Sequence, residues 1–226
     1  MKISDIEVKL IHHVGSDLDV VNAARVSFNK ESEWEFDYLL DRDILSTKDA
    51  KLIHYLAKHK HHSPFNHSFL SFRVKAPLYV ARQLVKHEYL PWNEVSRRYV
   101  DHELEYFQTE WRLAAENVKQ GSAGAVDSET QKKADEIFWS VAEHSCKAYE
   151  NLLSLGIAPE QARRVSLIDA ATEWRWSGTL KAFLKMLSLR LDNHAQKESR
   201  DVAQLIAKEV KELFPVSYAA YLGENH

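Results

Sequence analysis

Apolar side chains near the C-terminus recur every three or four residues, a spacing that gathers them onto one face of an α-helix. The stripe consists of Leu180, Phe183, Leu184, Leu187 and Leu191. Arg190 and His194 fall on this stripe or at its border, where a cation removed from water needs a partner. Similar spacing over residues 47–59, 127–155 and 202–213 predicts three further helices, so long helices dominate the chain.

Shorter segments have the alternating pattern of β-strands. They lie at residues 2–13, 69–74 and 172–176. Trp174 and Trp176 are neighbours on one face of the last strand and are expected in the core, with stacking on a nucleic-acid base as the alternative. Ser177 and Gly178 predict a turn directly after this strand.

The other segments are expected to form two loops and one long helix within a single domain. Residues 29–46 and 118–126 are expected to be loops, the second because of its glycines and small residues. The helix over 127–155 is expected to bury Ile137, Val141 and Cys146. Cys146 is interpreted as core packing, because nothing around it would lower a thiol pKa as a catalytic thiolate requires. The 226 residues suffice for one well-buried domain, so residues 1–226 are expected to form a single domain.

Charge and cysteine content narrow the classes of function. The net charge of -3 argues against a general nucleic-acid or polybasic membrane surface, so phosphate binding must be local. One cysteine excludes an intramolecular disulfide and favours a reducing compartment, most simply the cytoplasm. No apolar run has the length that spans a membrane.

The segment from Ala81 to Tyr99 is too polar for a protein core. If Pro77 opens a helix, Gln83, Lys86 and His87 share one face. The segment as a whole contributes Arg82, Gln83, Lys86, His87, Glu88, Asn93, Glu94, Ser96, Arg97 and Arg98. These donors and cations suit an anionic, hydrogen-bond-rich small molecule, whereas a solvated helix end with surface ion pairs is the alternative.

Histidines are dense between His59 and His67. A metal site is not expected there, because no thiolate or carboxylate completes a recognisable ligand set. No Gly-x-Gly-x-x-Gly motif occurs among the six glycines, which excludes a Rossmann-type dinucleotide site.

The polar segment resembles the signature of the flavin-dependent thymidylate synthase (ThyX) family. That signature reads Arg-His-Arg, seven residues, then Ser, with Asn-Glu before the Ser and Arg-Tyr after it. Here the matching residues are Lys86-His87-Glu88, Asn93-Glu94, Ser96 and Arg98-Tyr99. Three further segments are similar to family elements: Ala23–Phe28 (AARVSF), His61–His67 (HHSPFNH) and Leu189–Glu198 (LRLDNHAQKE). The matches together extend over nearly the whole chain.

The resemblance implies an α+β fold in which long helices pack around a modest, mostly antiparallel sheet. It implies reductive methylation of dUMP to dTMP, with methylene-tetrahydrofolate as carbon donor and FAD, reduced by NADPH, as hydride source. It also implies a homotetramer with active sites shared between chains.

Carried over residue by residue, the resemblance assigns two sets of binding residues. The dUMP set is Gln83, Lys86, Glu94, Ser96, Arg97, Arg98, Arg163 and Arg190. The FAD set is His61, Ser63, Lys86, His87, Glu88, Asn93, Glu94, Thr179, Lys181, Lys185 and His194. Arg190 and Ser96 are the catalytic candidates: the arginine would favour the N3-ionised pyrimidine, and the serine would position it and is not a nucleophile.

The chain departs from the family pattern at several positions. Lys86 and Glu88 replace the two signature arginines, and Thr179, Lys181 and Lys185 stand where many relatives have Asn, Arg and Asn. These differences cluster on the flavin side. Three hypotheses follow: a divergent active member in which lysines redistribute the positive charge, a flavin-dependent dUMP hydroxymethylase, or a nucleotide-binding relative that lost the flavin.

Overall fold

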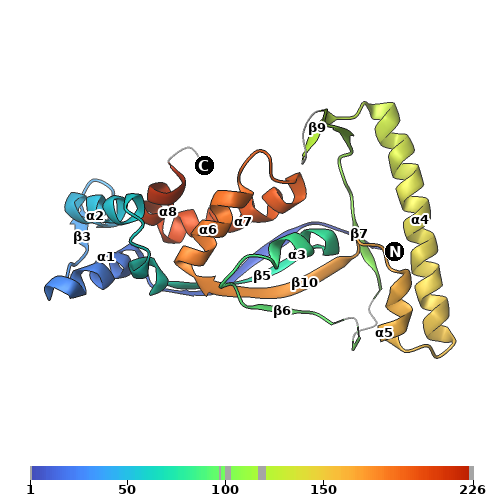
Figure 1. Cartoon of the computed structure of the whole chain (residues 1–226), viewed down its shortest axis with the longest axis horizontal. Helices are drawn as coiled ribbons and strands as arrows, with labels where there is room; N and C mark the ends of the chain where they lie inside the picture. Colours follow the sequence, from blue (N-terminus) through green and yellow to red (C-terminus); the bar gives the residue numbers. More distant parts are fainter. Residues whose placement is uncertain (1, 97, 100–102, 117–120, 224–226) are drawn as a thin grey trace.

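A four-stranded antiparallel sheet forms the centre of the protein in a computed structural model, which describes residues 2–96, 98, 99, 103–116 and 121–223 (Figure 1). The strand order is β2-β5-β10-β6. The strands are β2 (Glu7–Val14), β5 (Phe69–Pro77), β6 (Trp92–Glu94) and β10 (Ala171–Thr179). Three smaller two-stranded pairs accompany it, of which only β1 (Lys2–Ser4) with β7 (Glu105–Phe107) is parallel. The predicted α+β class and the mostly antiparallel sheet are therefore confirmed.

The central sheet buries one face under helices, which lie above it in Figure 1. Phe72 faces Trp176 across the β5–β10 ladder and Val74 faces Trp174, and all four side chains are buried. Arg73 and Arg175, one residue out of phase, are exposed, as the two-residue period of a strand requires. The predicted core position of both tryptophans is confirmed.

Helices close the core over this face and around one end of the sheet. They are α1 (Asp17–Arg25), α2 (Thr47–Lys58), α3 (Leu78–Leu84), α6 (Leu180–Arg190), α7 (Lys197–Leu213) and α8 (Pro215–Leu222). The predicted stripe of α6 is buried through Leu180, Phe183, Leu184 and Leu187. Short 3-10 turns occur at Val26–Phe28, Ser63–Asn66 and Arg163–Val165.

A second, smaller core lies at the opposite end of the molecule, where α4 (Ser128–Ser154) packs against α5 (Pro159–Ala162) and β7 (Figure 1). Cys146 is buried there, as predicted. The expectation for Ile137 and Val141 is wrong, because they remain 69% and 50% exposed. α4 buries a neighbouring stripe centred on Ala142 and Tyr149, since it contacts the body along one side only.

Three loop predictions need correction. Ser177 and Gly178 form no turn, because β10 continues to Thr179 beside β5. The segment 29–46 contains a hairpin of β3 (Glu35–Asp37) and β4 (Arg42–Ile44). In the segment 118–126, residues 122–125 form β9 (Ser122–Ala125), paired with β8 (Arg112–Ala114), whereas 118–120 lie outside the described residues. Short polar strands lack the apolar alternation that reveals longer ones. None of the helices in the described part of the chain is long and apolar enough to cross a bilayer.

Candidate active site

The signature segment follows a helix that is shorter than its spacing predicts. α3 starts after Pro77, as expected, but ends at Leu84. Lys86 and His87 therefore lie in a turn, in which the His87 N–H donates to the Leu84 carbonyl (3.1 Å). Tyr89 has a φ of 61°, a left-handed conformation that reverses the chain toward β6. The expectation that Gln83, Lys86 and His87 share one helical face is therefore wrong. Gln83 and His87 nevertheless both accept hydrogen bonds from the side chain of Arg190.

Arg190 is the last residue of α6 and reaches across to the signature segment. Its Nε donates to Nε2 of His87 (2.9 Å), and its Nη2 donates to the backbone carbonyl of Gln83 (3.1 Å). Arg190 has no carboxylate partner among the described residues. The guanidinium is thus oriented by two neutral acceptors and keeps its full positive charge. Partial burial lowers its pKa from the ordinary value, although Arg remains charged.

A cavity of about 900 Å³, here called the Arg190 pocket, opens beside this residue. Cationic side chains dominate its polar lining, and no carboxylate lines it within the described part of the chain. Its charged members are Arg82, Lys86, Arg112, Arg190, Lys197 and Arg200. His194 also lines the pocket, where its ring bonds to Asp192 (2.8 Å). The lining suits an anion or a ligand that develops negative charge.

Gln83, which also lines the Arg190 pocket, is held by a chain of hydrogen bonds. Its Nε2 donates to Oε1 of Gln196 (2.6 Å), and Ser199 donates to its Oε1 (3.0 Å). Gln196 in turn donates to Glu198 (2.9 Å). The N-terminal turn of α7 therefore fixes the amide of Gln83, which lies 113 residues away from Gln196 in sequence.

A second cavity of about 720 Å³, the Ser96 pocket, takes most of the other predicted nucleotide ligands. It is lined by Glu94, Ser96, Arg98 and Arg163, and Arg82 lines both pockets. The Ser96 hydroxyl accepts from the backbone N–H of Arg98 (3.3 Å), and Glu94 accepts from the Thr172 hydroxyl. Arg97 lies outside the described residues.

Two exposed cations, Arg98 and Arg163, line the Ser96 pocket. Arg163 follows α5 in a 3-10 turn, and its Nε donates to the Glu160 carbonyl (3.2 Å). Arg98 stacks near the ring of Tyr99, with its guanidinium carbon 5.0 Å from the ring centre. Neither arginine makes an ion pair within the described residues, so both have donors for a phosphate.

Five of the predicted FAD ligands, here called the α6 group, lie elsewhere, along α6 and the turn before β5: His61, Ser63, Thr179, Lys181 and Lys185. Thr179 caps α6 and also donates to Asn66 (2.9 Å), which joins this turn to the start of α6. Lys181 lies over the ring of Tyr221 at 4.7 Å, and Tyr221 bonds to His62 (2.9 Å). His61 and Ser63, at the same turn, are exposed.

The substituted signature residue Glu88 is paired within the chain. Its carboxylate accepts from Lys185 (3.2 Å), so one departure from the family pattern contacts another. Both side chains are more than half exposed, so this pair contributes little stability. Asn93 stands apart on β6, exposed, and His194 lies in the Arg190 pocket, so neither joins the α6 group.

The α6 group fits an anionic cofactor in its chemistry. Burial, and then the charge of Lys185, lower the pKa of Lys181. Two ammonium groups one helical turn apart are stabilised by an anion between them, and hydroxyls from Ser63 and Thr179 add donors. The donor set therefore suits a dinucleotide diphosphate. No group of three or more His, Cys, Asp or Glu residues within the described chain has the geometry of a metal site.

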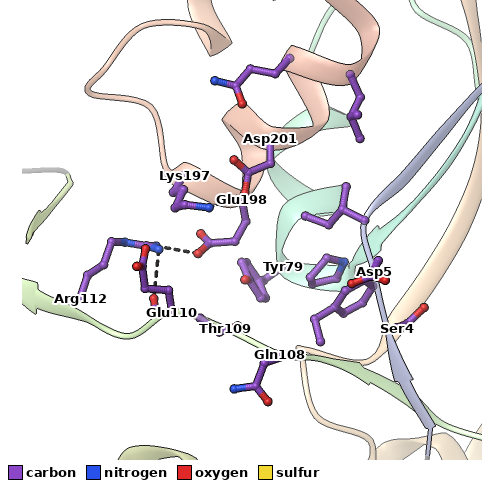
Figure 2. Close-up of a pocket in the computed structure, with 15 residues that line it drawn as sticks. Ser4, Asp5, Tyr79, Gln108, Thr109, Glu110, Arg112, Lys197, Glu198 and Asp201 are labelled. Atoms are coloured by element: carbon purple, nitrogen blue, oxygen red, sulfur yellow. Dashed lines mark hydrogen bonds and ion pairs between the residues drawn. The ribbon is translucent and has the colours of Figure 1, made fainter. Parts of the chain in front are cut away.

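A third cavity, of about 360 Å³, adjoins the Arg190 pocket and shares Arg112 and Lys197 with it (Figure 2). The Arg112–Glu198 ion pair spans 2.7 Å, and in the view of Figure 2 the Glu198 side chain lies between those of Arg112 and Tyr79. Burial, and then the charge of Glu198, raise the pKa of Tyr79. Sequence reasoning missed Arg112 and Tyr79 because neither belongs to a recognisable motif. Arg82 was named in the polar segment, although neither of the two ligand sets includes it.

The comparisons with known proteins agree with this geometry. The family model described as Thymidylate synthase complementing protein matches residues 9–216. The flavin-dependent thymidylate synthase of Kosmotoga olearia is 35% identical over 219 residues, covering 96% of this chain and 90% of that protein. The Thermus thermophilus enzyme of the same name is 37% identical over 220 residues, covering 97% of this chain and 76% of the relative.

The fold of this chain is also similar to that of a protein with a solved structure. The crystal structure of the UMP/dUMP methylase PolB from Streptomyces cacaoi, bound with 5-bromo dUMP, superimposes with a TM-score of 0.84 at 27% identity. The superposition covers 98% of this chain and 97% of that one. The family match, the relatives and the shared fold extend over nearly all residues, so the chain belongs to the family of flavin-dependent thymidylate synthases.

Proposed function

We propose that this protein methylates dUMP to dTMP, with methylene-tetrahydrofolate as carbon donor and NADPH as the source of electrons. The observation that carries the proposal is Arg190, a cation with no carboxylate partner among the described residues, held at the edge of a cation-lined pocket by two neutral acceptors. A group of this kind stabilises negative charge that develops on a ligand. Membership in the family supplies the reaction class.

The nucleotide would be held at its two ends. Ser96, Arg98 and Arg163 offer a hydroxyl and two guanidinium groups to the phosphate, because Arg binds phosphate with paired donors. Arg190 would face the pyrimidine and favour its N3-ionised form, in which charge spreads over O2, N3 and O4. Ser96 positions the nucleotide and takes no covalent part.

The cofactor would lie along α6, with Thr179, Lys181 and Lys185 toward its diphosphate and His61 and Ser63 at the adjacent turn. When bound, reduced FAD supplies the hydride. Lys181 and Lys185 together would replace the positive charge that Glu88 does not provide, since the Glu88–Lys185 pair is exposed and exchanges partners at small cost.

We further propose a homotetramer in which different chains complete each active site. The predicted dUMP ligands divide between two pockets of one chain, which supports a site closed by a neighbouring copy. Exposed apolar side chains support an assembly as well: Tyr38, Leu39, Leu40, Ile137 and Leu155. The pockets draw on residues from 78 to 200, so we treat residues 1–226 as one catalytic unit. Cys146, the single cysteine, can form no disulfide within the chain, which supports a reducing compartment such as the cytoplasm.

The decisive experiment identifies the nucleotide product by mass spectrometry. Protein is incubated with FAD, NADPH, methylene-tetrahydrofolate and dUMP under low oxygen, beside an Arg190→Gln control. We expect dTMP from the unaltered protein and none above background from the control. A hydroxymethyl product would instead identify a dUMP hydroxymethylase, and unchanged dUMP from protein that binds no FAD would identify a non-catalytic relative.

A further inference from the structure

The contact between Arg190 and His87 determines which nitrogen of the imidazole carries the proton. The Nε–H of Arg190 points at Nε2 of the imidazole (2.9 Å), and a guanidinium can only donate. Nε2 must therefore carry the lone pair, and the neutral ring carries its proton on Nδ1. With Nη2 bonded to the Gln83 carbonyl (3.1 Å), the plane of the guanidinium is held at two points.

The surroundings of His87 keep the ring uncharged. Burial, then the charge of Arg190 and then that of Lys185, lower its pKa to about 4. The ring of Trp176, from β10, lies 6.4 Å away on another side. The nearest acid in sequence, Glu88, is engaged with Lys185. Protonation would remove the acceptor and set two cations against each other, so both effects favour the neutral ring at physiological pH.

A neutral acceptor has a different electrostatic effect from a carboxylate. An Asp or Glu in this place would hold the guanidinium equally well, but it would cancel the charge that the ligand needs. A hydrophobic residue would leave the charge and lose the orientation. An imidazole that accepts one hydrogen bond provides orientation while leaving the charge uncompensated.

We infer that His87 is the positioning residue for Arg190, holding its guanidinium toward the pyrimidine through a neutral hydrogen bond. The inference rests on the proposed function, because it takes Arg190 as the cation that faces the nucleotide. It assigns His87 a task within the protein, separate from any contact that its Nδ1–H makes with the cofactor.

Three substitutions separate orientation from charge. His87→Gln keeps a neutral acceptor, His87→Glu keeps an acceptor but adds a negative charge, and His87→Leu removes the acceptor. His54→Leu, an exposed histidine on α2, is the matched control for the loss of an imidazole. Circular dichroism and thermal unfolding establish that each variant folds, and the Gln and Glu variants keep the test valid if the Leu variant does not.

The readout is the ionisation of bound dUMP, followed by ultraviolet absorbance over a pH titration of the holoenzyme without folate. The unaltered protein and the Gln and His54 variants should lower the N3 ionisation midpoint of dUMP below that of the free nucleotide. The Leu and Glu variants should return it toward the free value, and the Leu variant should bind dUMP about tenfold or more weakly, as for loss of a charged hydrogen bond.

The outcomes distinguish two failures. If Arg190→Gln abolishes the lowered midpoint but His87→Leu and His87→Glu retain it, the positioning role of His87 is wrong and the proposed function stands. If the unaltered protein binds dUMP without lowering the midpoint, the role of Arg190 is wrong, and the inference falls with it. Nitrogen NMR gives an independent check, since a His87 ring with its proton on Nε2 at neutral pH would also overturn the inference.

Discussion

Arg112 of β8 and Glu198 of α7 are 86 residues apart, yet Nη2 and Oε1 lie 2.7 Å from each other. Both side chains are more than four-fifths buried. Glu198 also accepts from Gln196, which fixes Gln83, and Arg112 donates to Ser122 of β9. The ion pair therefore links the β8–β9 pair to Gln196 and Gln83, which line the Arg190 pocket.

Replacing Glu198 by Gln should lower the free energy of unfolding by about 1.5–3 kcal/mol, because a largely buried guanidinium loses its charged partner. Chemical denaturation measures the loss. Glu129→Gln, which removes an exposed ion pair to Lys133, is the control and should change stability by less than about 0.5 kcal/mol. Equal losses in the two variants would show that the Arg112–Glu198 pair stabilises the protein no more than an exposed ion pair does.

Glu105 of β7 predicts a pH dependence of stability. Burial alone would raise the pKa of Glu105, but hydrogen bonds from Lys75 and Lys2 outweigh it and lower the pKa to about 2. A lowered carboxyl pKa contributes stability above the ordinary value of 4.5, and this contribution is lost as pH falls toward 2. Screening weakens the pair with Lys2, which is 60% exposed, so most of the contribution comes from Lys75, whose side chain is 13% exposed.

Denaturation of the unaltered protein and of Glu105→Gln at several pH values tests this. The difference in unfolding free energy should be present at neutral pH and disappear near pH 2. Glu136→Gln, on the exposed side of α4, should follow the unaltered protein throughout. A difference for Glu105→Gln that stays constant from pH 7 to pH 2 would contradict the explanation.

Gly178 allows the signature turn to approach the sheet. A methyl group on Gly178 would lie 2.5 Å from Leu90 Cδ2 and 2.9 Å from the Tyr89 carbonyl oxygen. Gly178→Ala should therefore destabilise the protein by about 1–3 kcal/mol and displace the turn that carries His87. Gly124→Ala adds a methyl group that would lie more than 4 Å from every other described residue except its chain neighbours, so its stability should stay within about 0.5 kcal/mol. Thermal unfolding compares the two variants. Equal stability of both would show that the close contact of Gly178 with Tyr89 and Leu90 is not required.

Arg163 is predicted to bind the nucleotide phosphate. Arg163→Gln should weaken dUMP binding about tenfold or more, as expected for loss of a charged hydrogen bond, and should leave the weak binding of deoxyuridine unchanged. Calorimetric titration with both ligands measures this, with Lys132→Gln on α4 as the control for lost surface charge. A parallel loss for deoxyuridine would place Arg163 away from the phosphate.

Much of the fold follows from periodicity. The stripe of α6 and the alternation around Trp174 and Trp176 predict which faces are buried, because a regular spacing has one geometric solution. Ile137 and Val141 show the limit of this reasoning. An apolar stripe tells which residues could be buried, whereas the position of a neighbouring element decides which are.

The sequence by itself determined the main helices, three of the four central strands and the motifs that link the chain to its family, because these depend on local spacing and residue chemistry. Only the tertiary structure decided that His87 meets Arg190 and that Glu88 meets Lys185, 103 and 97 residues apart. Such contacts depend on how α6 crosses the turn after α3, and side-chain spacing along one segment carries no information about the element packed against it.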